Sequence, residues 1–321
     1  MSGSPRPAGS PVRSPAGPGG TAALLVEALP YIRRFQDAVV VVKYGGNALA
    51  ASAAPAPVAA GTAVAPAPAG GPGSDRAALA SFAQDVALLR SVGMRPVVVH
   101  GGGPQIGSLL GRLGMATQFR DGQRVTDADT LDVVRMVLVG KVNRDIVSAI
   151  NVHGPLAVGL SGEDANLITA VAHAGDLGFV GTVAGVDATM LNRLLSERLV
   201  PVLATIGADA GGQAYNINAD TVAGAVAEAL SAEKLIFLTD VEGLRADPAD
   251  PATLLRRVSA GDLSAMVASG AATGGMVPKV EACARAVRGG VRRAHVLDGR
   301  VPHALLLELF TDGGVGTMVA P

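Results

Sequence analysis

A lysine and two glycines follow a run of four valines near the start of the chain. Lys43 comes directly after residues 39–42, and Gly45 and Gly46 follow two and three positions later. A lysine at the end of a buried strand is costly unless it faces an anion or solvent, and glycines let a ligand approach the backbone closely. A single glycine pair is more often a simple tight turn, so this pattern favours phosphate or carboxylate binding only together with a second loop of the same kind.

A second glycine loop follows another apolar run, residues 96–99. Gly101, Gly102 and Gly103 precede Pro104, a residue that suits the first turn of a helix. The free N–H groups and the dipole at such a helix start attract anions. Neither loop has the Gly-Lys-Ser/Thr sequence of a Walker A loop, and the second lacks the last glycine of a dinucleotide fingerprint. We therefore expect two anion-binding loops of another kind.

Polar residues also lie near the expected starts of two helices. Arg124 precedes one helix, and its planar fork suits a carboxylate, although an isolated arginine in such a place is usually a surface residue. Residues 215–220 place Asn216, Asn218 and Asp220 at the start of another helix. The simpler interpretation of Asn218 is that it merely caps this helix, which is the more frequent role of such a residue. These residues predict further contacts to a polar ligand.

Lysine is scarce in this chain, which has four lysines and 22 arginines. Lys279 lies in the first turn of an expected helix, where a cation opposes the helix dipole. A lysine differs from an arginine in presenting a compact point charge rather than a planar fork. We interpret Lys43 and Lys279 as groups that bind an anionic ligand; the alternative is that the four lysines are simply residual.

The sequence lacks the patterns of several common chemistries. Its five histidines show no metal-ligand spacing, and its single cysteine, Cys283, excludes a disulfide framework and a multi-cysteine metal site. It contains no evident nucleophile motif. Glycines and lysines without a nucleophile suit phosphoryl transfer to a carboxylate that is already ionised, because such an acceptor needs only positioning and charge neutralisation.

The composition excludes other classes of protein. The 321 residues carry a formal net charge of −1, which argues against a nucleic-acid-binding protein. No apolar run approaches the ~18 residues of a membrane span, and the first 20 residues lack the apolar region of a secretory signal. We expect a cytoplasmic protein with no nucleic-acid or membrane partner, built as two domains or one large one.

Short apolar runs alternate with helical patterns, which predicts an α/β fold with a mainly parallel open sheet covered by helices on both faces. Thr126 and Asp129 have the spacing of a capping box, and Asp187 is placed to cap a later helix. Strands are expected at residues 38–42, 96–99, 156–160, 200–205, 235–239 and 294–297, and helices at residues 75–92, 104–113, 127–151, 188–198, 219–230, 276–287 and 302–309.

Three segments lie outside this alternation. An amphipathic helix within residues 22–36 precedes the first strand, and Pro30 is expected to kink or break it. This helix packs either on its own domain or on a partner. Residues 1–21 are expected to form a disordered tail, and residues 50–73, rich in alanine and proline, a disordered loop insertion.

Together these motifs resemble the amino acid kinase family, and within it the members that phosphorylate N-acetyl-L-glutamate. The resemblance implies a three-layer α/β/α sandwich with two lobes, in which residues 37–231 bind N-acetyl-L-glutamate and residues 232–321 bind ATP. It also implies transfer of the γ-phosphoryl group of ATP to the side-chain carboxylate, a step of arginine biosynthesis, with Mg²⁺ carried by the ATP and no protein metal site. The segments that carry it are residues 43–48, 98–106, 124–128, 215–221, 238–243, 275–280 and 294–300.

The resemblance assigns roles to individual residues of this sequence. Lys43 and Lys279 would stabilise the transferring phosphoryl group, and Asp220 would orient both lysines. The remaining contacts would come from Gly102, Gly103, Arg124 and Asn216 to the substrate and from Gly45, Gly46 and Asp240 to the nucleotide phosphates.

The same resemblance extends to regulation. Arginine-sensitive members of the family carry a helix before the first strand that interlaces with that of a neighbouring subunit, whereas insensitive members lack it. This implies feedback inhibition by L-arginine in a hexamer, a trimer of dimers. The arginine site would comprise Tyr31, Lys234, His295, Glu308 and the backbone at Gly314, with Glu308 facing the guanidinium and Lys234 the carboxylate.

Two alternatives stay open at this point. One is another member of the family, such as aspartokinase, glutamate 5-kinase, carbamate kinase, UMP kinase or the kinase for carrier-linked aminoadipate; the other is a catalytically silent arginine sensor. Two features depart from the family pattern, namely the insertion after residue 49 and Glu163, which stands where many relatives have a basic residue. The second puts a nucleotide contact at that position in doubt.

Overall fold

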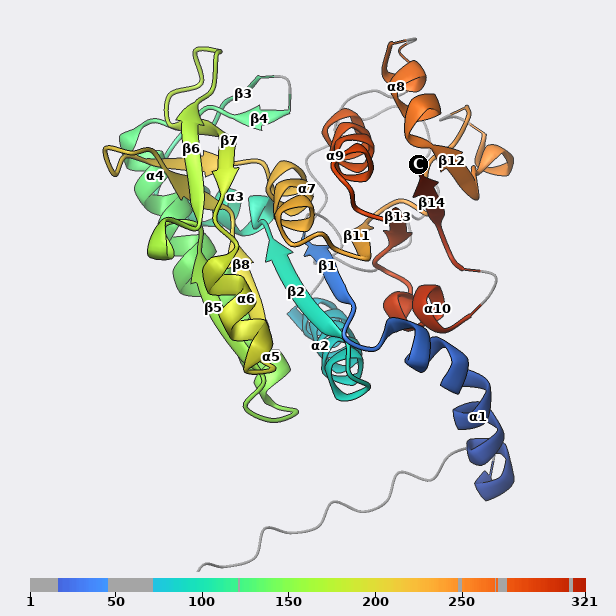
Figure 1. Ribbon diagram of the computed structural model, residues 1–321. Helices are drawn as coiled ribbons and strands as arrows, with labels where there is room; N and C mark the ends of the chain where they lie inside the picture. Colours follow the sequence, from blue (N-terminus) through green and yellow to red (C-terminus); the bar gives the residue numbers. More distant parts are fainter. Residues whose placement is uncertain are drawn as a thin grey trace, which may run out of the picture.

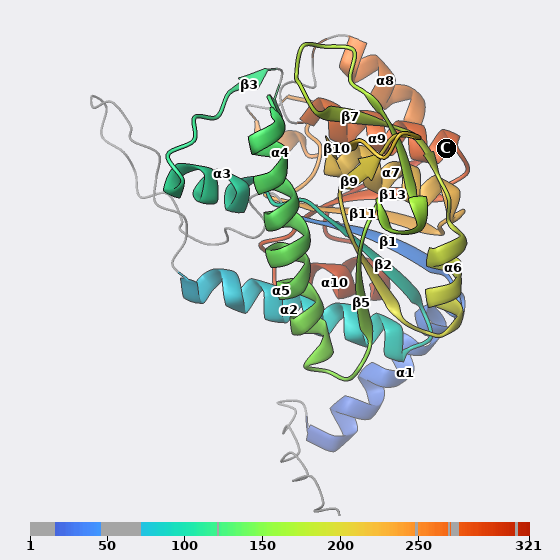
Figure 2. The ribbon, with the colours of Figure 1, turned by 90° about the vertical axis from the view of Figure 1, so that its left-hand side faces the viewer.

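The computed structural model describes residues 17–45, 72–120, 122–247, 250–268, 270, 276–311 and 314–321. Within these residues the chain forms an α/β fold around one eight-stranded sheet, with helices on both of its faces (Figures 1 and 2). The expected fold class is therefore confirmed. Gly46, the tail up to residue 16 and the part of the expected insertion up to residue 71 lie outside the described residues.

The sheet is parallel from its centre to one edge. All six expected strands are present close to their expected bounds and pair in parallel, whereas β14 pairs antiparallel with β13 at the other edge. The two strands at that edge, β12 and β14, were not expected. In sheet order the strands are β12 (Arg257–Ser259), β14 (Thr317–Ala320), β13 (Arg293–Asp298), β11 (Lys234–Thr239), β1 (Val39–Tyr44), β2 (Arg95–His100), β8 (Val200–Ala204) and β5 (Ala157–Ser161).

Helices form two apolar cores, one on each face of the sheet. One face carries α6 (Thr189–Ser196), α7 (Ala219–Ala229), α8 (Ala260–Ala268) and α9 (Met276–Arg288). The other carries α2 (Pro72–Ser91), α3 (Gly103–Arg112), α4 (Ala128–Arg135), α5 (Asn143–Asn151) and α10 (Ala304–Phe310). Of these helices, only α8 was not expected. None of the described helices combines the length and the apolar character needed to cross a bilayer.

The pleat of β1 decides which side chains face which core. Successive residues of a strand point to opposite faces of its sheet, and Val41 belongs to the core of α7 and α9 whereas Val42 belongs to that of α2 and α5. Lys43 therefore projects towards α7 and α9. Tyr44 projects to the opposite face, where its ring stacks on Phe82 of α2 with 3.9 Å between centroids.

The helix expected at residues 127–151 has three parts, α4, a π-helical segment η2 (Met136–Val142) and α5. It is capped by Asp127, whose Oδ1 accepts the N–H of Thr130 at 2.8 Å. The expectation that Thr126 caps it was wrong, because the Thr126 hydroxyl donates to the carbonyl of Arg124 instead. Asp187 accepts the N–H of Thr189 at 2.9 Å, but the N-cap position of that later helix is Ala188, so Asp187 lies one residue before the expected cap position.

Four further strands form a second β unit beside the sheet. They close into a small barrel, β10 (Ala214–Ile217), β7 (Val180–Val186), β6 (Ile168–Ala172) and β9 (Ile206–Ala208). A hairpin of β3 (Phe119–Arg120) and β4 (Gln123–Arg124) forms a separate two-stranded sheet, and two 3₁₀ turns, η3 (Asp164–Asn166) and η4 (Pro251–Thr253), occur in loops. None of these strands was expected; β3, β4 and β9 have only two or three residues each, and glycine or alanine interrupts the apolar pattern of β6 and β7.

The helix before the first strand, α1 (Gly17–Phe35), extends away from the body and contacts α10 near its end (Figure 1). It begins earlier than expected and continues through Pro30, so the expected break there was wrong. Proline removes the hydrogen bond to the carbonyl four residues earlier. That residue, Val26, is 69% exposed, so water can satisfy its carbonyl.

Candidate active site

Two lysines and one aspartate form a buried charged cluster at the carboxyl ends of the central strands. Nζ of Lys43 lies 3.0 Å from Oδ1 of Asp220, an ion-pair contact. Nζ of Lys279 donates to Oδ2 of Asp220 at 2.9 Å. The structure thus brings together three predicted site residues that lie far apart in the sequence.

Local structure explains why these three side chains meet. Lys43 is directed towards α7 and α9 by the pleat of β1. Asn218 caps α7 by accepting the N–H groups of Asp220 and Thr221 at 2.8 and 3.2 Å, which places Asp220 in the first turn of that helix. Lys279 lies in the first turn of α9, which packs against α7. Two helix starts and one strand end therefore converge.

The cluster carries one net positive charge when both lysines are protonated. Burial lowers the pKa of Lys43, and the charge of Lys279 lowers it further, while Asp220 opposes both. Burial alone would raise the pKa of Asp220, but the two ammonium groups outweigh it and hold that pKa below its usual range. The aspartate is therefore ionised, and the excess positive charge can be satisfied by an anion.

The two glycine loops touch each other beside this cluster. A Cβ on Gly45 would lie 3.2 Å from the amide nitrogen of Gly101, and the φ of Gly45, +138°, lies in the region that favours glycine. A Cβ on Gly102 would lie 2.8 Å from Cδ2 of Leu138 in η2. Gly103 begins α3, and a Cβ there would meet no atom within 4 Å. The loops thus form one surface, open at Gly103.

Arg124 is held against the second loop and is not a surface residue. Its guanidinium donates to the carbonyl of Gly103 at 3.3 Å and to the hydroxyl of Thr117, and its Cζ lies 4.6 Å from the ring centroid of Phe119. The residue is buried, and burial lowers the pKa of its side chain. The guanidinium is thus a fixed cation beside the loop start.

The two other predicted contact residues belong to different parts of the fold, the barrel and the end of β11. Asn216 lies in β10, where its Nδ2 donates to the hydroxyl of Thr126 at 3.4 Å. Asp240 directly follows β11 and accepts the hydroxyl of Thr239 at 3.1 Å. Its charge raises the pKa of Lys43, a smaller influence than burial and Asp220. The barrel and the end of β11 thus each supply one polar group.

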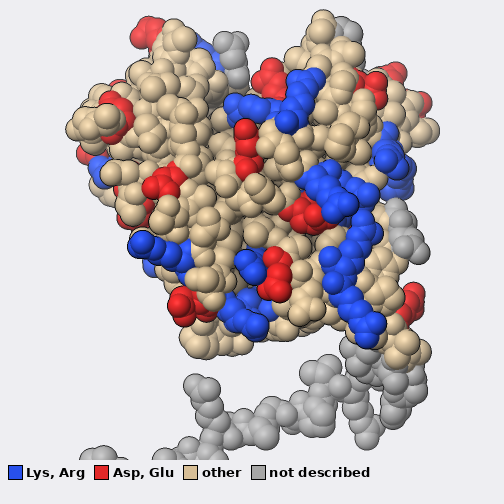
Figure 3. Space-filling model, in the orientation of Figure 1, with Lys and Arg blue, Asp and Glu red and all other residues tan. Residues whose placement is uncertain are grey.

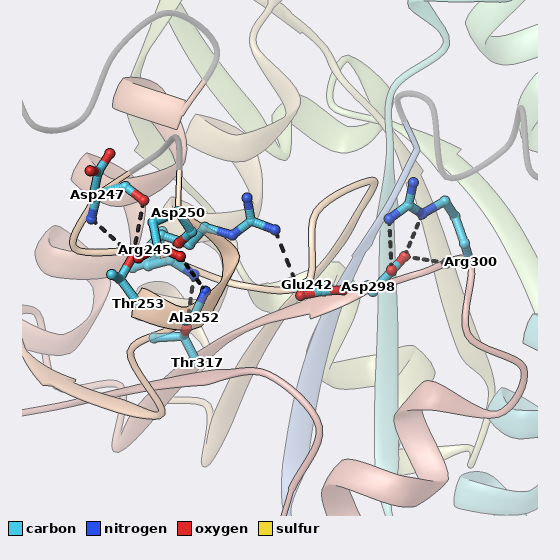
Figure 4. A network of polar contacts seen from close by, with 10 residues as sticks. Glu242, Arg245, Asp247, Asp250, Ala252, Thr253, Asp298, Arg300 and Thr317 are labelled. Atoms are coloured by element: carbon cyan, nitrogen blue, oxygen red, sulfur yellow. Dashed lines mark hydrogen bonds and ion pairs between the residues drawn. The ribbon is translucent and has the colours of Figure 1, made fainter. Parts of the chain in front are cut away.

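Polar contacts fix the loops after β11 and β13 (Figure 4). The guanidinium of Arg300 donates to both carboxylate oxygens of Asp298 at 2.8 Å. The N–H of Leu244 donates to the hydroxyl of Thr317 at 2.8 Å, which ties the loop after β11 to β14. These bonds hold the loops that follow β11 and β13 in place.

A second cluster of titratable groups lies between the sheet and α10. Nδ1 of His295 lies 2.7 Å from Oε1 of Glu308, and Oε2 of Glu308 accepts the N–H of Val315 at 2.9 Å. Gly314 has a φ of +54°, and a Cβ there would lie 2.8 Å from Oε2 of Glu308. The structure therefore brings three residues of the predicted arginine site into contact.

The end of α1 completes the surroundings of this cluster. Nζ of Lys234 lies 5.2 Å from the ring centroid of Phe35, the buried last residue of α1. Tyr31 precedes Phe35 by four residues, and residues with this spacing share one face of a helix. All five residues predicted for the arginine site thus belong to α1, β11, β13, α10 and the turn after α10.

Buried charges perturb the residues of this second cluster. Burial lowers the pKa of Lys234 to about 8; Glu308 opposes the shift, while Arg293 and Arg34 add to it. Burial also lowers the pKa of His295. Burial would raise the pKa of Glu308, but His295 outweighs it and the pKa falls. Figure 3 shows basic side chains gathered where α1 joins the body, so an anionic group would be attracted here.

Sequence reasoning missed one buried pair beside the second loop, His100 and Asn143. Nδ2 of Asn143 lies 3.1 Å from Nε2 of His100, and both residues are fully buried. The histidines were considered only as metal ligands. A signal was present, because Asn143 shares a helix face with Ile146 and Ile150 and is therefore a polar residue at a core position.

Within the described ranges, no group of three or more His, Cys, Asp or Glu residues could hold a metal ion. Glu163, which departs from the family pattern, forms an ion pair with Arg135 of α4 at 2.8 Å. This pairing directs its carboxylate to a neighbouring helix.

Comparisons with known proteins agree with this geometry. The acetylglutamate kinase of Symbiobacterium thermophilum is 52% identical over 307 residues, which cover 93% of this chain and 97% of the relative. Among solved structures, N-acetylglutamate synthase from Neisseria gonorrhoeae complexed with coenzyme A and N-acetyl-glutamate is 26% identical with a TM-score of 0.75, covering 94% of this chain. The same synthase complexed with coenzyme A and L-arginine gives a TM-score of 0.73 at 26% identity and 93% coverage.

The chain spans 63% and 65% of the synthase chains in these two structures, so it is similar to only part of that protein. The match to the acetylglutamate kinase extends over nearly its full length. The model of the amino acid kinase family matches residues 38–298, a range that includes both glycine loops, all three residues of the charged cluster, and Arg124 and Asn216. The chain belongs to the amino acid kinase family.

Proposed function

We propose that the chain transfers the γ-phosphoryl group of ATP to the side-chain carboxylate of N-acetyl-L-glutamate, with N-acetyl-L-glutamyl 5-phosphate and ADP as products. A carboxylate oxygen forms a bond to the γ-phosphorus while the bond from that phosphorus to the β–γ bridging oxygen breaks. The acceptor is ionised at neutral pH, so no general base is needed. The observation that carries the proposal is the Lys43–Asp220–Lys279 cluster beside two glycine loops and a fixed arginine.

The two lysines neutralise the charge that the transferring phosphoryl group spreads over its oxygens. Asp220 holds both ammonium groups in place before the reaction, so little reorganisation is needed in the transition state. Gly45 and Gly46 approach the nucleotide phosphates, and Asp240 lies at the same end of the site. ATP brings its Mg²⁺ with it, as a substrate complex.

The acceptor binds on the other side of the cluster. Gly102 and Gly103 offer backbone N–H groups at the start of α3, where no earlier turn supplies an intrahelical acceptor. Arg124 binds the α-carboxylate and Asn216 contributes a side-chain hydrogen bond. In this proposal residues 37–231 hold N-acetyl-L-glutamate and residues 232–321 hold ATP. Dependence on ATP fits the cytoplasmic location expected from the sequence.

An assay of ADP release with a panel of acceptors tests the proposal. N-acetyl-L-glutamate is expected to give turnover, whereas unacetylated glutamate, aspartate, carbamate and UMP are expected to give little. Turnover with one of the other acceptors would assign the chain to another branch of the family. Binding of arginine with no turnover on any acceptor would make it an arginine sensor.

Arg124→Lys is expected to weaken N-acetyl-L-glutamate binding about tenfold and to leave nucleotide binding unchanged. A lysine cannot reproduce the bidentate fork that a carboxylate prefers. Calorimetric titration of each ligand separately measures the effect. Equal weakening of both ligands would give Arg124 a structural role in place of a binding one.

We further propose that L-arginine inhibits the enzyme at the second cluster, in a hexamer assembled through α1. Glu308 receives the guanidinium, and Lys234 the carboxylate, with His295, Tyr31 and the backbone at Gly314 completing the site. Support comes from the ionised carboxylate of Glu308 beside a buried lysine and from the L-arginine complex of the related synthase. Arginine inhibits only if it binds one conformation better than another.

Inhibition by arginine is expected to weaken as the pH rises above about 8. Lys234 has its pKa lowered to about 8, so it loses its proton in this range and no longer attracts the ligand's carboxylate. The inhibition constant should rise by up to about tenfold per pH unit. The Lys234→Arg variant stays charged throughout and should show a flatter profile; the same slope in both proteins would exclude Lys234 as the titrating group.

A further inference from the structure

The side chain of His100 links the second glycine loop to α5. His100 is the last residue of β2. Val98, two residues earlier in the strand, packs in the core that α5 covers, so the side chain of His100 points to that same face, opposite to that of Lys43. Its Nδ1 lies 3.0 Å from the carbonyl oxygen of Gly101, and its Nε2 lies 3.1 Å from Nδ2 of Asn143. The imidazole therefore lies between the loop and a helix side chain.

The hydrogen bonds of Asn143 define the tautomer of His100. The Oδ1 of Asn143 accepts a hydrogen bond from the guanidinium of Arg144, and its Nδ2 donates to the carbonyls of Val202 at 2.8 Å and Leu160 at 3.3 Å. With the amide so oriented, the group that faces Nε2 of His100 is an N–H donor and cannot accept, so Nε2 is the unprotonated ring nitrogen. The single ring proton is on Nδ1 and is donated to the Gly101 carbonyl. Burial lowers the pKa of His100 to about 4, so the ring stays neutral at physiological pH.

Fixing the Gly101 carbonyl fixes the next N–H group as well. A trans peptide is planar, with its C=O and N–H pointing in opposite directions. The N–H of Gly102 therefore points away from the imidazole. The side of Gly102 that faces η2 leaves no room for a side chain, because the Cβ of an alanine there would lie 2.8 Å from Leu138 and 3.1 Å from Val142.

The position of Asn143 is itself built into the neighbouring elements. The π-helical segment η2 ends at Val142, directly before Asn143, and such segments locally shift the face on which the following residues lie. In β5, Gly159 leaves the space that the side chains of Asn143 and Arg144 occupy. Gly159 in β5 and the π-helical segment η2 thus both allow the side-chain amide of Asn143 to reach His100.

We propose that His100 and Asn143 are positioning residues that aim the Gly102 N–H at the acceptor. In this arrangement Asn143 selects the Nδ1–H tautomer of His100, and His100 holds the Gly101 carbonyl. The inference rests on the proposed function, because the ligand of the Gly102 N–H is the N-acetyl-L-glutamate that this function assigns. Neither side chain touches the substrate.

Two substitutions separate the two ring nitrogens. In His100→Asn, the amide nitrogen occupies the position of Nδ1 and can still donate to the Gly101 carbonyl. In His100→Gln, the amide reaches the position of Nε2, so contact with Asn143 is kept and the donor to Gly101 is lost. We expect H100Q to raise the KM for N-acetyl-L-glutamate about tenfold, the effect of losing one aligned hydrogen bond. The KM for ATP should change less than about twofold, and H100N should recover most of the loss.

A structural role without positioning predicts a different result. It would lower the Tm of both variants and leave the KM for N-acetyl-L-glutamate the same in H100N and H100Q, which would overturn the proposal. The tautomer is measured without any substitution, by ¹⁵N NMR of the histidine-labelled wild-type protein at neutral pH. A proton on Nδ1 of His100 is the expected result, and a proton on Nε2 would overturn the proposal.

The same experiments distinguish failure of this inference from failure of the proposed function. Wild-type turnover of N-acetyl-L-glutamate with equal KM values in both variants leaves the function intact and removes the positioning role. Absence of wild-type turnover removes the function and with it the ligand assigned to Gly102.

Discussion

Replacing Lys279 by alanine is expected to lower kcat for N-acetyl-L-glutamate phosphorylation about 100- to 1,000-fold, with little change in either KM. Removing one preorganised charge donor from a transition state typically costs ~2.7–4 kcal/mol. Lys279 is buried with its ammonium fixed by Asp220, so neither water nor a neighbouring side chain replaces it. Lys43→Ala should have an effect of the same size, and steady-state kinetics with both substrates varied measures each.

Lys141 provides a matched control for the charge. It is an exposed lysine of η2, paired with Asp145 at 3.0 Å, so Lys141→Ala should keep kcat within about twofold. Lys279→Arg should restore only part of the activity, because a planar fork does not replace a compact ammonium. Wild-type kcat in Lys279→Ala would remove that lysine from the transition state.

Loss of a lysine also affects folding, and this effect must be separated from catalysis. Lys279→Ala leaves Asp220 paired with Lys43 alone, so the remaining pair is neutral, but Oδ2 of Asp220 loses its hydrogen bond from Lys279 and stays buried without that donor. The Tm should therefore fall. Adding Asp220→Asn removes the carboxylate that pairs with Lys43 and leaves that ammonium as an uncompensated buried charge, so the Tm should fall further and kcat should not recover. Loss of kcat at temperatures well below the Tm of Lys279→Ala would assign the loss to catalysis and not to misfolding.

The central part of the fold could be predicted because its strands are buried on both faces. The valines of β1 and β2 form continuous apolar runs that only a covered parallel sheet explains. The barrel strands could not be predicted, because glycines such as Gly181 and Gly207 replace the side chains that would show an alternating pattern. At these glycines the backbone lies close to side chains of the neighbouring strands. A close approach of this kind produces no alternation of apolar and polar residues in the sequence.

Site residues were predictable where an unfavourable local placement needed an explanation. Lys279 opposes a helix dipole and Lys43 ends an apolar strand, so each required an anion nearby. The contact of Lys43 and Lys279 with one carboxylate depends on the packing of α7 against α9, which no local pattern encodes. His100 was missed because its two partners, Gly101 and Asn143, are neutral, and because the polar residue at the core position 143 was the one signal of the pair.

Outside the active site, the largest effect is expected from removing most of helix α1, which should change the oligomeric state. The side chains of this helix include exposed apolar ones, with Val26 at 69% and Leu29 at 40% exposure, and it extends from the body (Figure 1). Such exposure on an amphipathic helix fits a second copy of the same helix. Deleting residues 1–30 is expected to convert a hexamer into dimers, measured by light scattering after size exclusion.

Ending this deletion at Pro30 keeps the arginine cluster intact. Tyr31 and Phe35 remain, so the aromatic ring beside Lys234 stays in place. Catalytic activity without arginine should be largely retained, because the Lys43–Asp220–Lys279 cluster lies on the opposite face of the sheet from α10. Inhibition by arginine should weaken at least about tenfold if the hexamer stabilises the inhibited conformation.

A double substitution tests the same helix without removing it. Val26→Glu with Leu29→Glu places charges on the exposed apolar positions and should produce dimers with weakened inhibition, whereas Glu27→Gln on the same helix should leave the hexamer and its inhibition unchanged. Dimers that are inhibited as strongly as the intact protein would separate arginine binding from assembly. A hexamer that persists after the deletion, or full activity of the intact enzyme in millimolar arginine, would contradict the regulatory role of α1, because the coupling requires both assembly through this helix and a difference in arginine affinity between two conformations.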